Sequence, residues 1–188
     1  MPNNKLFDKL APLYDKVIGS RDPEILIKLL DLPIDGKLLD AGGGTGRVSL
    51  ALKDHVGQLV ISDLSRSMIL EAKIKGHEHL VQTSVTENPF PSDYFERIIV
   101  VDALHHFPDQ EGTVKELIRI LKPGGKLLIE EPDINRFSVK LVALAEKLAL
   151  MGSHIHPPKE IKAMIERNGL EAKIISDGNF ATYITAFK

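Results

Sequence analysis

Residues 38–47 read LLDAGGGTGR, and this stretch decides the fold of the chain. Two apolar residues lead into Asp40, and Gly42, Gly44 and Gly46 follow at alternate positions. Glycine lets the backbone turn sharply and lets a ligand approach where a Cβ would clash. A helix that starts after such a loop offers free N–H groups to a carboxylate or a phosphate. The stretch therefore predicts a ligand-binding turn between a strand and a helix.

The glycine spacing separates this loop from two other nucleotide-binding loops. A dinucleotide fingerprint needs G-x-G-x-x-G, but counted from Gly42 its third glycine position is Arg47. No Gly-Lys-Ser/Thr ends the loop, which excludes a P-loop. The pattern that remains is D-x-G-x-G-x-G. Asp63 ends the next predicted strand about 20 residues further on, where a carboxylate can accept the hydroxyls of a ribose. The alternative role for Asp63 is that of a helix cap beside Ser65.

A strand-then-helix alternation runs outward from the loop. The expected strands cover residues 36–42, 58–63, 80–84, 97–103 and 126–131, and the expected helices between them cover 46–55, 65–76 and 109–121. Ser65 is placed to cap its helix, and the KPGG run at 122–125 ends the last one. Residues 97–103 are nearly all apolar, as in a strand buried on both faces of a parallel sheet. The alternation predicts a doubly wound α/β domain.

The two ends of the chain add further elements. Helices are expected at 5–18, 23–30, 137–151 and 157–168, and strands at 171–176 and 180–187. The last two strands are joined by Asp-Gly-Asn, a hairpin signal. The sequence leaves three possible roles for the apolar face of 137–151: it packs on the domain, covers an apolar ligand or forms a homodimer surface.

Composition excludes several classes of protein. The 188 residues carry 24 Lys and Arg against 26 Asp and Glu, and the net charge of -2 argues against a mainly electrostatic nucleic-acid binder. The absence of Cys excludes thiolate metal sites, disulfides and thiol nucleophiles. No apolar stretch is long enough for a membrane span, and the first residues lack the apolar core of a signal peptide. We therefore expect a cytoplasmic protein without a membrane span.

Four stretches of the chain together resemble the class I S-adenosylmethionine-dependent methyltransferases. They are LLDAGGGTGR (38–47), ISDLSRSM (61–68), NPFPSDYFERIIVVDALHHFPD (88–109) and ELIRILKPGGKLLIEEPD (116–133). The resemblance implies a Rossmann-like seven-stranded sheet with the last strand antiparallel and helices on both faces. It also implies S-adenosyl-L-methionine as cofactor and S-adenosyl-L-homocysteine as product. FDKLAPLYD (7–15) further resembles an N-terminal lid segment of the ubiquinone/menaquinone-biosynthesis methyltransferase group.

The resemblance also implies a division of the chain. It predicts a single domain over 1–188, with lid helices in 1–35, a cofactor-binding core in 36–133, a substrate-lid segment in 134–157, and a C-terminal helix and hairpin in 158–188.

Carried over by position, the resemblance assigns cofactor contacts. Asp40 would hold the ammonium group of the methionine portion, Asp63 would take the ribose hydroxyls, and Ser84 would lie beside the adenine. The implied cofactor contacts are Tyr14, Asp40, Ala41, Gly42, Gly44, Gly46, Asp63, Leu64, Met68, Ser84, Val85, Asp102 and Ala103. Family members usually carry Asp where Ser84 stands. Serine accepts a hydrogen bond without a charge, so we expect weaker cofactor binding than in those members.

No catalytic base follows from the sequence. Methyl transfer from a sulfonium is an in-line displacement, so a base is needed only if the acceptor arrives protonated. His105, His106 and Tyr14 are the catalytic candidates, although packing and capping are the alternative roles of the two histidines. The candidates for the substrate pocket are His105, His154 and His156, with a solvated loop as the alternative for the last two. We expect no metal site, and we expect His77 and His79 at the surface.

The chemistry of the residues narrows the acceptor. The usual methylation of pyrimidines at C5 and the methylation of arsenite both require a thiol, and the chain has no Cys to supply one. The run at 102–105 is Asp-Ala-Leu-His rather than the Asn/Asp-Pro-Pro-aromatic run of adenine N6 methylation. A small-molecule acceptor, with no nucleic-acid partner, is therefore the predicted substrate class. Two other hypotheses are a non-catalytic cofactor-binding subunit that regulates a partner protein and a nicotinamide-dependent oxidoreductase, which Arg47 disfavours.

Overall fold

A computed structural model describes residues 23–132, 154–176 and 181–188 of the chain. The strands are β1 (Ile34–Ala41), β2 (Val56–Asp63), β3 (His79–Gln82), β4 (Phe95–Val101), β5 (Leu121–Pro132), β6 (Ala172–Ser176) and β7 (Ala181–Phe187). The α-helices are α2 (Pro23–Leu29), α3 (Ser49–Leu52), α4 (Arg66–Ile74), α5 (Gln110–Ile120) and α7 (Pro158–Arg167). Three short 3-10 helices are η1 (Lys53–His55), η2 (Val85–Glu87) and η3 (Leu104–His106).

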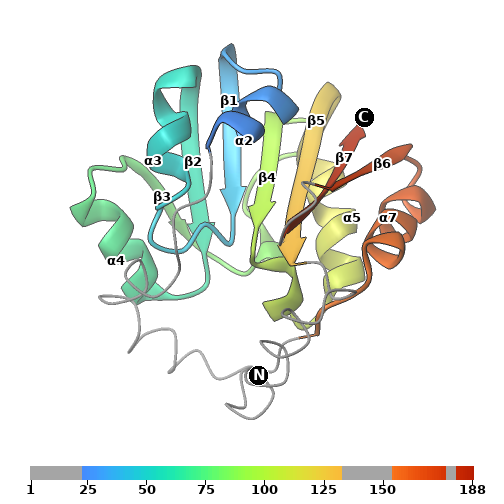
Figure 1. The fold of residues 1–188 in the computed structure, drawn as a ribbon. Coiled ribbons are helices and arrows are strands. Elements are labelled where there is room, and N and C mark those ends of the chain that lie inside the picture. Colours follow the sequence, from blue (N-terminus) through green and yellow to red (C-terminus); the bar gives the residue numbers. More distant parts are fainter. Residues whose placement is uncertain (1–22, 133–153, 177–180) are drawn as a thin grey trace.

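The strands form one seven-stranded sheet in the order β3-β2-β1-β4-β5-β7-β6 (Figure 1). The first five pair in parallel, and β7 runs antiparallel to both β5 and β6. This confirms the predicted doubly wound sheet with its antiparallel last strand. The chain reverses its direction of winding between β1 and β4. In sheets of this kind, ligands bind at that point, outside the carboxyl ends of the strands.

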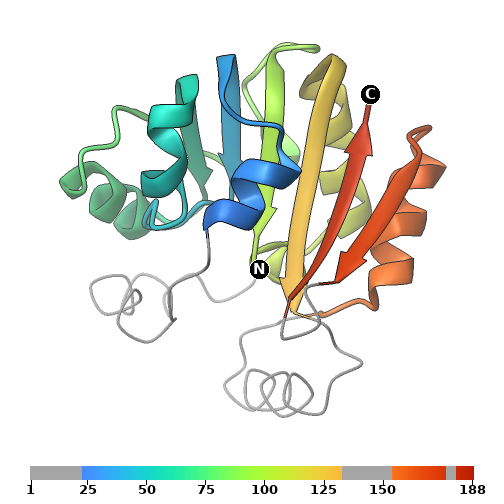
Figure 2. The ribbon, with the colours of Figure 1, turned by 45° about the horizontal axis from the view of Figure 1, so that its top comes forward.

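Helices cover both faces of the sheet (Figure 2). Leu38 of β1 packs with Leu26 of α2 in one hydrophobic core, and the next residue, Leu39, packs with Leu117 of α5 in the other. Successive side chains of a strand point to opposite faces, so one apolar strand supplies both cores. The nearly continuous apolar runs of the sequence follow from this arrangement.

Side-chain caps begin the two helices that flank the ligand-binding edge. Ser65 Oγ accepts a hydrogen bond from Met68 N at 3.2 Å at the start of α4, which confirms the predicted cap. Asp109 Oδ1 accepts from Gly112 N at 2.8 Å at the start of α5. Each cap satisfies an N–H group that has no partner within the helix.

Several element boundaries differ from the predicted ones. The helix expected over 46–55 is reduced to α3 and η1, because the glycine loop continues past Gly46, which has a φ of +70°. The strand expected over 80–84 ends at Gln82, so Ser84 lies just beyond it. The KPGG run does not precede β5 but lies within it. Its residues bulge out where the pairing of β5 with β4 steps from Leu121 to Lys126.

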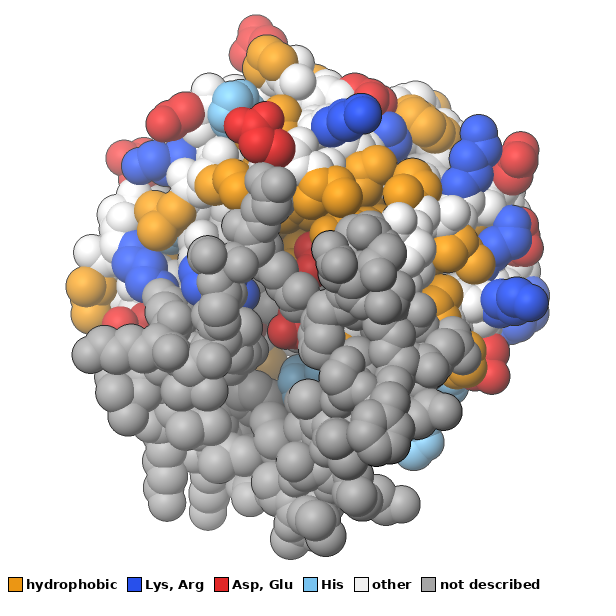
Figure 3. All heavy atoms as spheres, in the orientation of Figure 1, with side chains coloured by type: hydrophobic (Ala, Val, Ile, Leu, Met, Phe, Trp, Pro, Cys, Tyr) orange, Lys and Arg blue, Asp and Glu red, His pale blue; other side chains and the backbone are white. Residues whose placement is uncertain are grey.

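Several predicted elements lie outside the described residues. They are the helices at 5–18 and 137–151 and the hairpin turn at 177–179. None of the helices in the described part of the chain is long and apolar enough to cross a membrane. On the face shown in Figure 3, basic and acidic side chains are intermixed over the coloured part of the surface.

Candidate functional site

The loop after β1 folds back onto the end of β2. The backbone N–H groups of Gly42 and Gly43 both donate to Ser62 O, at 2.8 and 3.1 Å, and Gly46 N donates to Gly43 O at 2.9 Å. Gly42, Gly44 and Gly46 have φ values of +73°, +55° and +70°. These values lie in the left-handed region, where side chains with a Cβ are strained. The alternate spacing of glycine in the sequence therefore reflects three left-handed residues in a single loop.

Asp40 is a buried carboxyl group at the end of β1. Its side chain is shielded from solvent, and Ser49 Oγ donates to its Oδ2 at 2.6 Å. Burial raises the pKa of Asp40 to about 6, and the nearby Asp63 adds to this, while the hydrogen bond from Ser49 and the charge of Arg47 act in the opposite direction. A cationic group bound nearby would restore the ionised form. Asp40 is therefore suited to holding a ligand cation.

Asp63 joins the glycine loop to the start of α4. Its Oδ2 accepts from Gly44 N at 3.0 Å, and its Oδ1 accepts from Ser65 N at 2.7 Å. The sequence left two possible roles for Asp63, a ribose contact and a helix cap. Ser65 supplies the cap of α4, and the carboxylate of Asp63 fixes two turns at the edge of the sheet.

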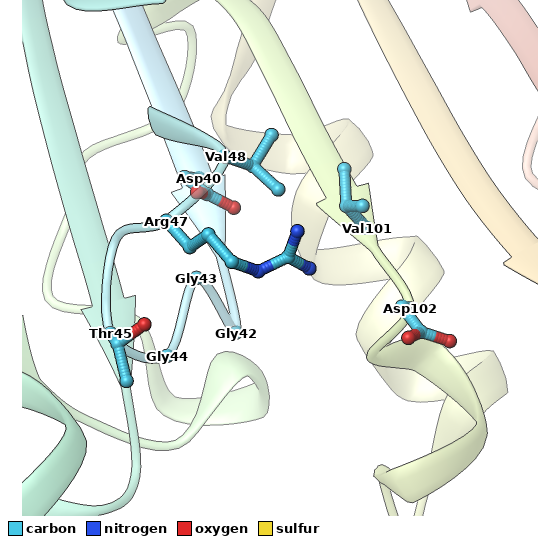
Figure 4. Close-up of a pocket in the computed structure, with 9 residues that line it drawn as sticks. All are labelled: Asp40, Gly42, Gly43, Gly44, Thr45, Arg47, Val48, Val101 and Asp102. Carbon is cyan, nitrogen blue, oxygen red and sulfur yellow. The ribbon is translucent and has the colours of Figure 1, made fainter. Parts of the chain in front are cut away.

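A pocket opens between this loop and the end of β4 (Figure 4). It is lined by Asp40, Gly42, Gly43, Gly44, Thr45, Arg47, Val48, Val101 and Asp102. The Arg47 side chain extends from the loop toward the β4 side of the opening (Figure 4). A methyl group placed on Gly44 would meet only Met68 Sδ, at 3.9 Å, so the space beside this glycine is open. The empty volume of the opening is about 400 Å³, which includes open solvent.

His77 packs against the glycine loop. It is buried, so the prediction that it lies at the surface was wrong. The side chain is 7% exposed, and its Nε2 lies 3.0 Å from Gly46 O. A methyl group placed on Gly46 would lie 2.5 Å from the His77 ring. Burial lowers the pKa of His77, so the neutral ring donates to the carbonyl oxygen. No local pattern predicts this contact, because it joins residues that are 31 positions apart.

The turn after β4 forms the opposite wall of the pocket. Asp102 has a φ of +54°, although it is not glycine, and His105 is only 3% exposed. His105 Nδ1 lies 2.5 Å from Oε2 of the buried Glu131, a residue that the sequence did not single out. Burial lowers the pKa of the neighbouring His106 to about 3, and the proximity of His105 adds to the shift. The His105 ring is therefore buried in the turn, and His106 is half-buried beside it.

Comparison with known proteins gives the family. A model of the methyltransferase domain matches residues 39–129. The uncharacterized methyltransferase YcgJ of Bacillus subtilis is 30% identical over 194 residues, covering 95% of this chain and 76% of that protein. The chain belongs to the class I S-adenosylmethionine-dependent methyltransferases.

Further comparisons give a relative that matches part of this methyltransferase chain and solved structures that match its fold. The ubiquinone/menaquinone biosynthesis C-methyltransferase UbiE of Vibrio vulnificus is 34% identical over 105 residues, but the match covers 50% of this chain and 40% of that enzyme. The crystal structure of YcgJ superimposes with a TM-score of 0.75 at 22% identity, covering 88% of this chain and 97% of that one. Phosphoethanolamine N-methyltransferase 2 of Haemonchus contortus, solved with S-adenosyl-L-methionine, gives 0.77 at 16% identity, covering 96% and 57%. These structures share the fold.

The residues of the methyltransferase pocket suit the family's cofactor, S-adenosyl-L-methionine. Gly44 leaves open space for a close approach, and Asp40 offers a carboxyl group next to it. Of the predicted contacts, Asp40, Gly42, Gly44 and Asp102 line the pocket. Ala41, Gly46, Met68, Val85 and Ala103 are buried and do not line it, Asp63 and Ser84 are half-buried, and Leu64 is exposed. Tyr14 lies outside the described residues, and the sequence missed Arg47, Val48 and Val101 as pocket residues.

The two histidines of the predicted substrate segment are arranged differently from each other. His154 is exposed, and its backbone N–H donates to His105 O at 2.8 Å. His156 Nδ1 lies 2.5 Å from Glu160 Oε2 at the first turn of α7. Among the described residues, no group of three or more His, Asp or Glu side chains is placed to hold a metal ion.

Proposed function

We propose that this chain transfers the methyl group of S-adenosyl-L-methionine to a small-molecule acceptor by in-line displacement. The observation that carries the proposal is the open loop at Gly44 beside the buried Asp40, at the carboxyl edge of a parallel sheet. When bound, the cofactor supplies an activated methyl group on a positively charged sulfur. The work left to the protein is to bind, to orient and to exclude water.

Two residues that line the pocket, together with Asp63, carry the binding role in this proposal. Asp40 would hold the ammonium group of the methionine portion, because a bound cation offsets the burial that disfavours its charge. The backbone at Gly44 would lie against the same portion without a Cβ to block it. Asp63, fixed by hydrogen bonds from Gly44 N and Ser65 N, would receive the ribose hydroxyls.

Other predicted contacts complete the cofactor site. Leu64, Met68, Ser84 and Val85 would surround the adenine, and Asp102 and Ala103 would close the methionine side. No general base is assigned. His105 is buried against Glu131, and the low pKa of His106 leaves that ring neutral throughout the physiological pH range.

A small molecule is the acceptor class that the relatives and the residues favour together. UbiE is named for methylation in ubiquinone and menaquinone biosynthesis. This chain contains no Cys for the usual pyrimidine C5 chemistry. The decisive assay incubates the chain and a labelled methyl donor with a metabolite extract, and separately with RNA and with protein. Label in a low-molecular-weight product supports the proposal, whereas label in RNA or protein contradicts it.

The cofactor site itself is tested by two glycine substitutions. Gly44→Ala and Gly124→Ala both place a methyl group on a residue with positive φ, and neither meets an atom closer than 3.9 Å. Each is expected to lower the free energy of unfolding by about 1–2 kcal/mol. Only Gly44→Ala should also weaken S-adenosylhomocysteine binding, by about tenfold or more, in titration calorimetry. Equal binding by the two variants would contradict the proposed site.

A further inference from the structure

Glu131 is a buried carboxylate whose two oxygens both hold the turn after β4. Oε1 accepts from the backbone N–H groups of Ala103 and Leu104, at 3.2 and 2.8 Å. Oε2 lies 2.5 Å from His105 Nδ1, and both side chains are 3% exposed. A carboxylate at this depth requires donors on both oxygens to remain ionised. Three consecutive residues of the turn supply them.

The contact with Glu131 also fixes the state of the His105 ring. We assign the proton of the pair to His105 Nδ1, because an ionised carboxylate can only accept a hydrogen bond. A ring turned the other way would not present Nδ1 to Glu131, so this hydrogen bond holds the ring in one orientation. The His105 ring is therefore fixed relative to the turn and does not rotate freely.

The turn that Glu131 holds is packed against the glycine loop. Asp102, with its left-handed φ of +54°, lines the pocket at the start of the turn. A methyl group placed on Gly42 would lie 3.0 Å from Ala103 Cβ and 2.8 Å from the Phe107 ring. The glycine loop and the turn after β4 are therefore in direct contact. Backbone strain of the kind seen at Asp102 persists only where surrounding contacts enforce it.

The same turn also reaches the segment at 154–157. His105 O accepts from His154 N at 2.8 Å, and Gln110 Nε2 donates to His154 O at 2.8 Å. The backbone of His154 is thus held between the turn after β4 and the first residue of α5. Any displacement of His105 would move the cofactor wall and this segment together.

We propose that Glu131 is a positioning residue that sets the geometry of the cofactor pocket, and that it links the pocket to the segment at 154–157 through His105. It acts without touching the cofactor: it holds Ala103 and Leu104 by their backbone and His105 by its ring. This inference rests on the proposed function. Removing the charge of Glu131 should therefore weaken cofactor binding, although Glu131 does not line the pocket.

The test compares Glu131→Gln with Glu171→Gln. Glutamine keeps an oxygen for the backbone N–H groups of Ala103 and Leu104, but it offers His105 an amide in place of a carboxylate. Glu171 is exposed just before β6, so its substitution removes the same charge without a buried partner. Calorimetry with S-adenosylhomocysteine, on protein shown to be folded by circular dichroism, should give about tenfold weaker binding for Glu131→Gln only.

A second readout does not depend on binding. Nitrogen-15 NMR of the imidazole groups should place the His105 proton on Nδ1 in the wild type and on Nε2 in Glu131→Gln, because the new amide would donate to Nδ1. His105→Gln keeps Glu131 with its two backbone bonds. If the pair acts as a unit, the double variant should bind no more weakly than Glu131→Gln alone.

The outcomes separate the two proposals. Wild-type protein that does not bind S-adenosylhomocysteine contradicts the proposed function. Wild-type protein that binds, with unchanged affinity in a folded Glu131→Gln or an equal loss in Glu171→Gln, contradicts the positioning role. If Glu131→Gln does not fold, His105→Gln decides the question, and unchanged affinity in that variant overturns the role as well.

Discussion

At the scale of single residues, the negative charge of Asp40 lowers the stability of the fold, whereas the proposed contact with the cofactor's ammonium group requires that charge. Its pKa is 3.8 in the unfolded chain and about 6 in the folded one. The folded state therefore binds the proton more tightly, and the contribution to stability is complete below about pH 4 and is lost as the pH rises through 6. Asp40→Asn should raise the free energy of unfolding near neutral pH, by up to about 3 kcal/mol.

Urea unfolding of both proteins as a function of pH tests this expectation. Asparagine keeps an acceptor for Ser49 Oγ, so the difference reports mainly on the charge. The two curves should converge toward pH 4. A variant that is less stable than the wild type near neutral pH would contradict the burial argument. The same variant should bind S-adenosylhomocysteine more weakly near neutral pH, because it has no charge for the ammonium group.

Ser84 is the second residue at which a single side chain is expected to change binding. It follows β3, and its Oγ lies 2.9 Å from Thr86 Oγ1. Ser84→Asp should bind S-adenosylhomocysteine more tightly, by about threefold to tenfold, because a charged acceptor makes a stronger hydrogen bond to an amino group. Ser84→Asn is the uncharged control. Calorimetry that gives unchanged or weaker binding for Ser84→Asp would rule out its predicted place beside the adenine.

At the scale of elements, α5 depends on a cap that also borders the site. Asp109 accepts from Gly112 N at the first turn, immediately after the turn held by Glu131. Asp109→Ala should lower the free energy of unfolding by about 1 kcal/mol. Lys115→Ala on the same helix is exposed and is the control, with an expected change within about 0.5 kcal/mol. Chemical denaturation measures both, and equal effects would contradict the capping role.

The sequence predicted some helices and strands more accurately than others, and the reasons are local. The inner strands β2 and β4 were recognised as strands because their central residues, 59–61 and 98–100, are apolar and buried. The helix after the glycine loop was overextended, because no residue type marks where a left-handed loop ends. The bulge at 122–125 was read as a break, although strand pairing continues on both sides of it.

At the scale of the whole molecule, the pocket exists only in the folded chain. Asp40, Asp63 and Asp102 come from the ends of β1, β2 and β4, which meet at one edge of the sheet. S-adenosylhomocysteine should therefore stabilise the protein by about 2.7 kcal/mol at about 100 times its dissociation constant. Thermal unfolding measures the shift, with NADH at the same concentration as control. Stabilisation by NADH instead would favour an oxidoreductase.

The sequence by itself determined the order of the strands and helices, the glycine loop and the two carboxylates beside it. These features are local: apolar periodicity selects strands, and a left-handed backbone selects glycine. Tertiary structure alone decided that Glu131 holds His105 and that His77 holds Gly46, because these contacts join residues 26 and 31 positions apart. The raised pKa of Asp40 has the same origin, since burial depends on everything packed around the loop.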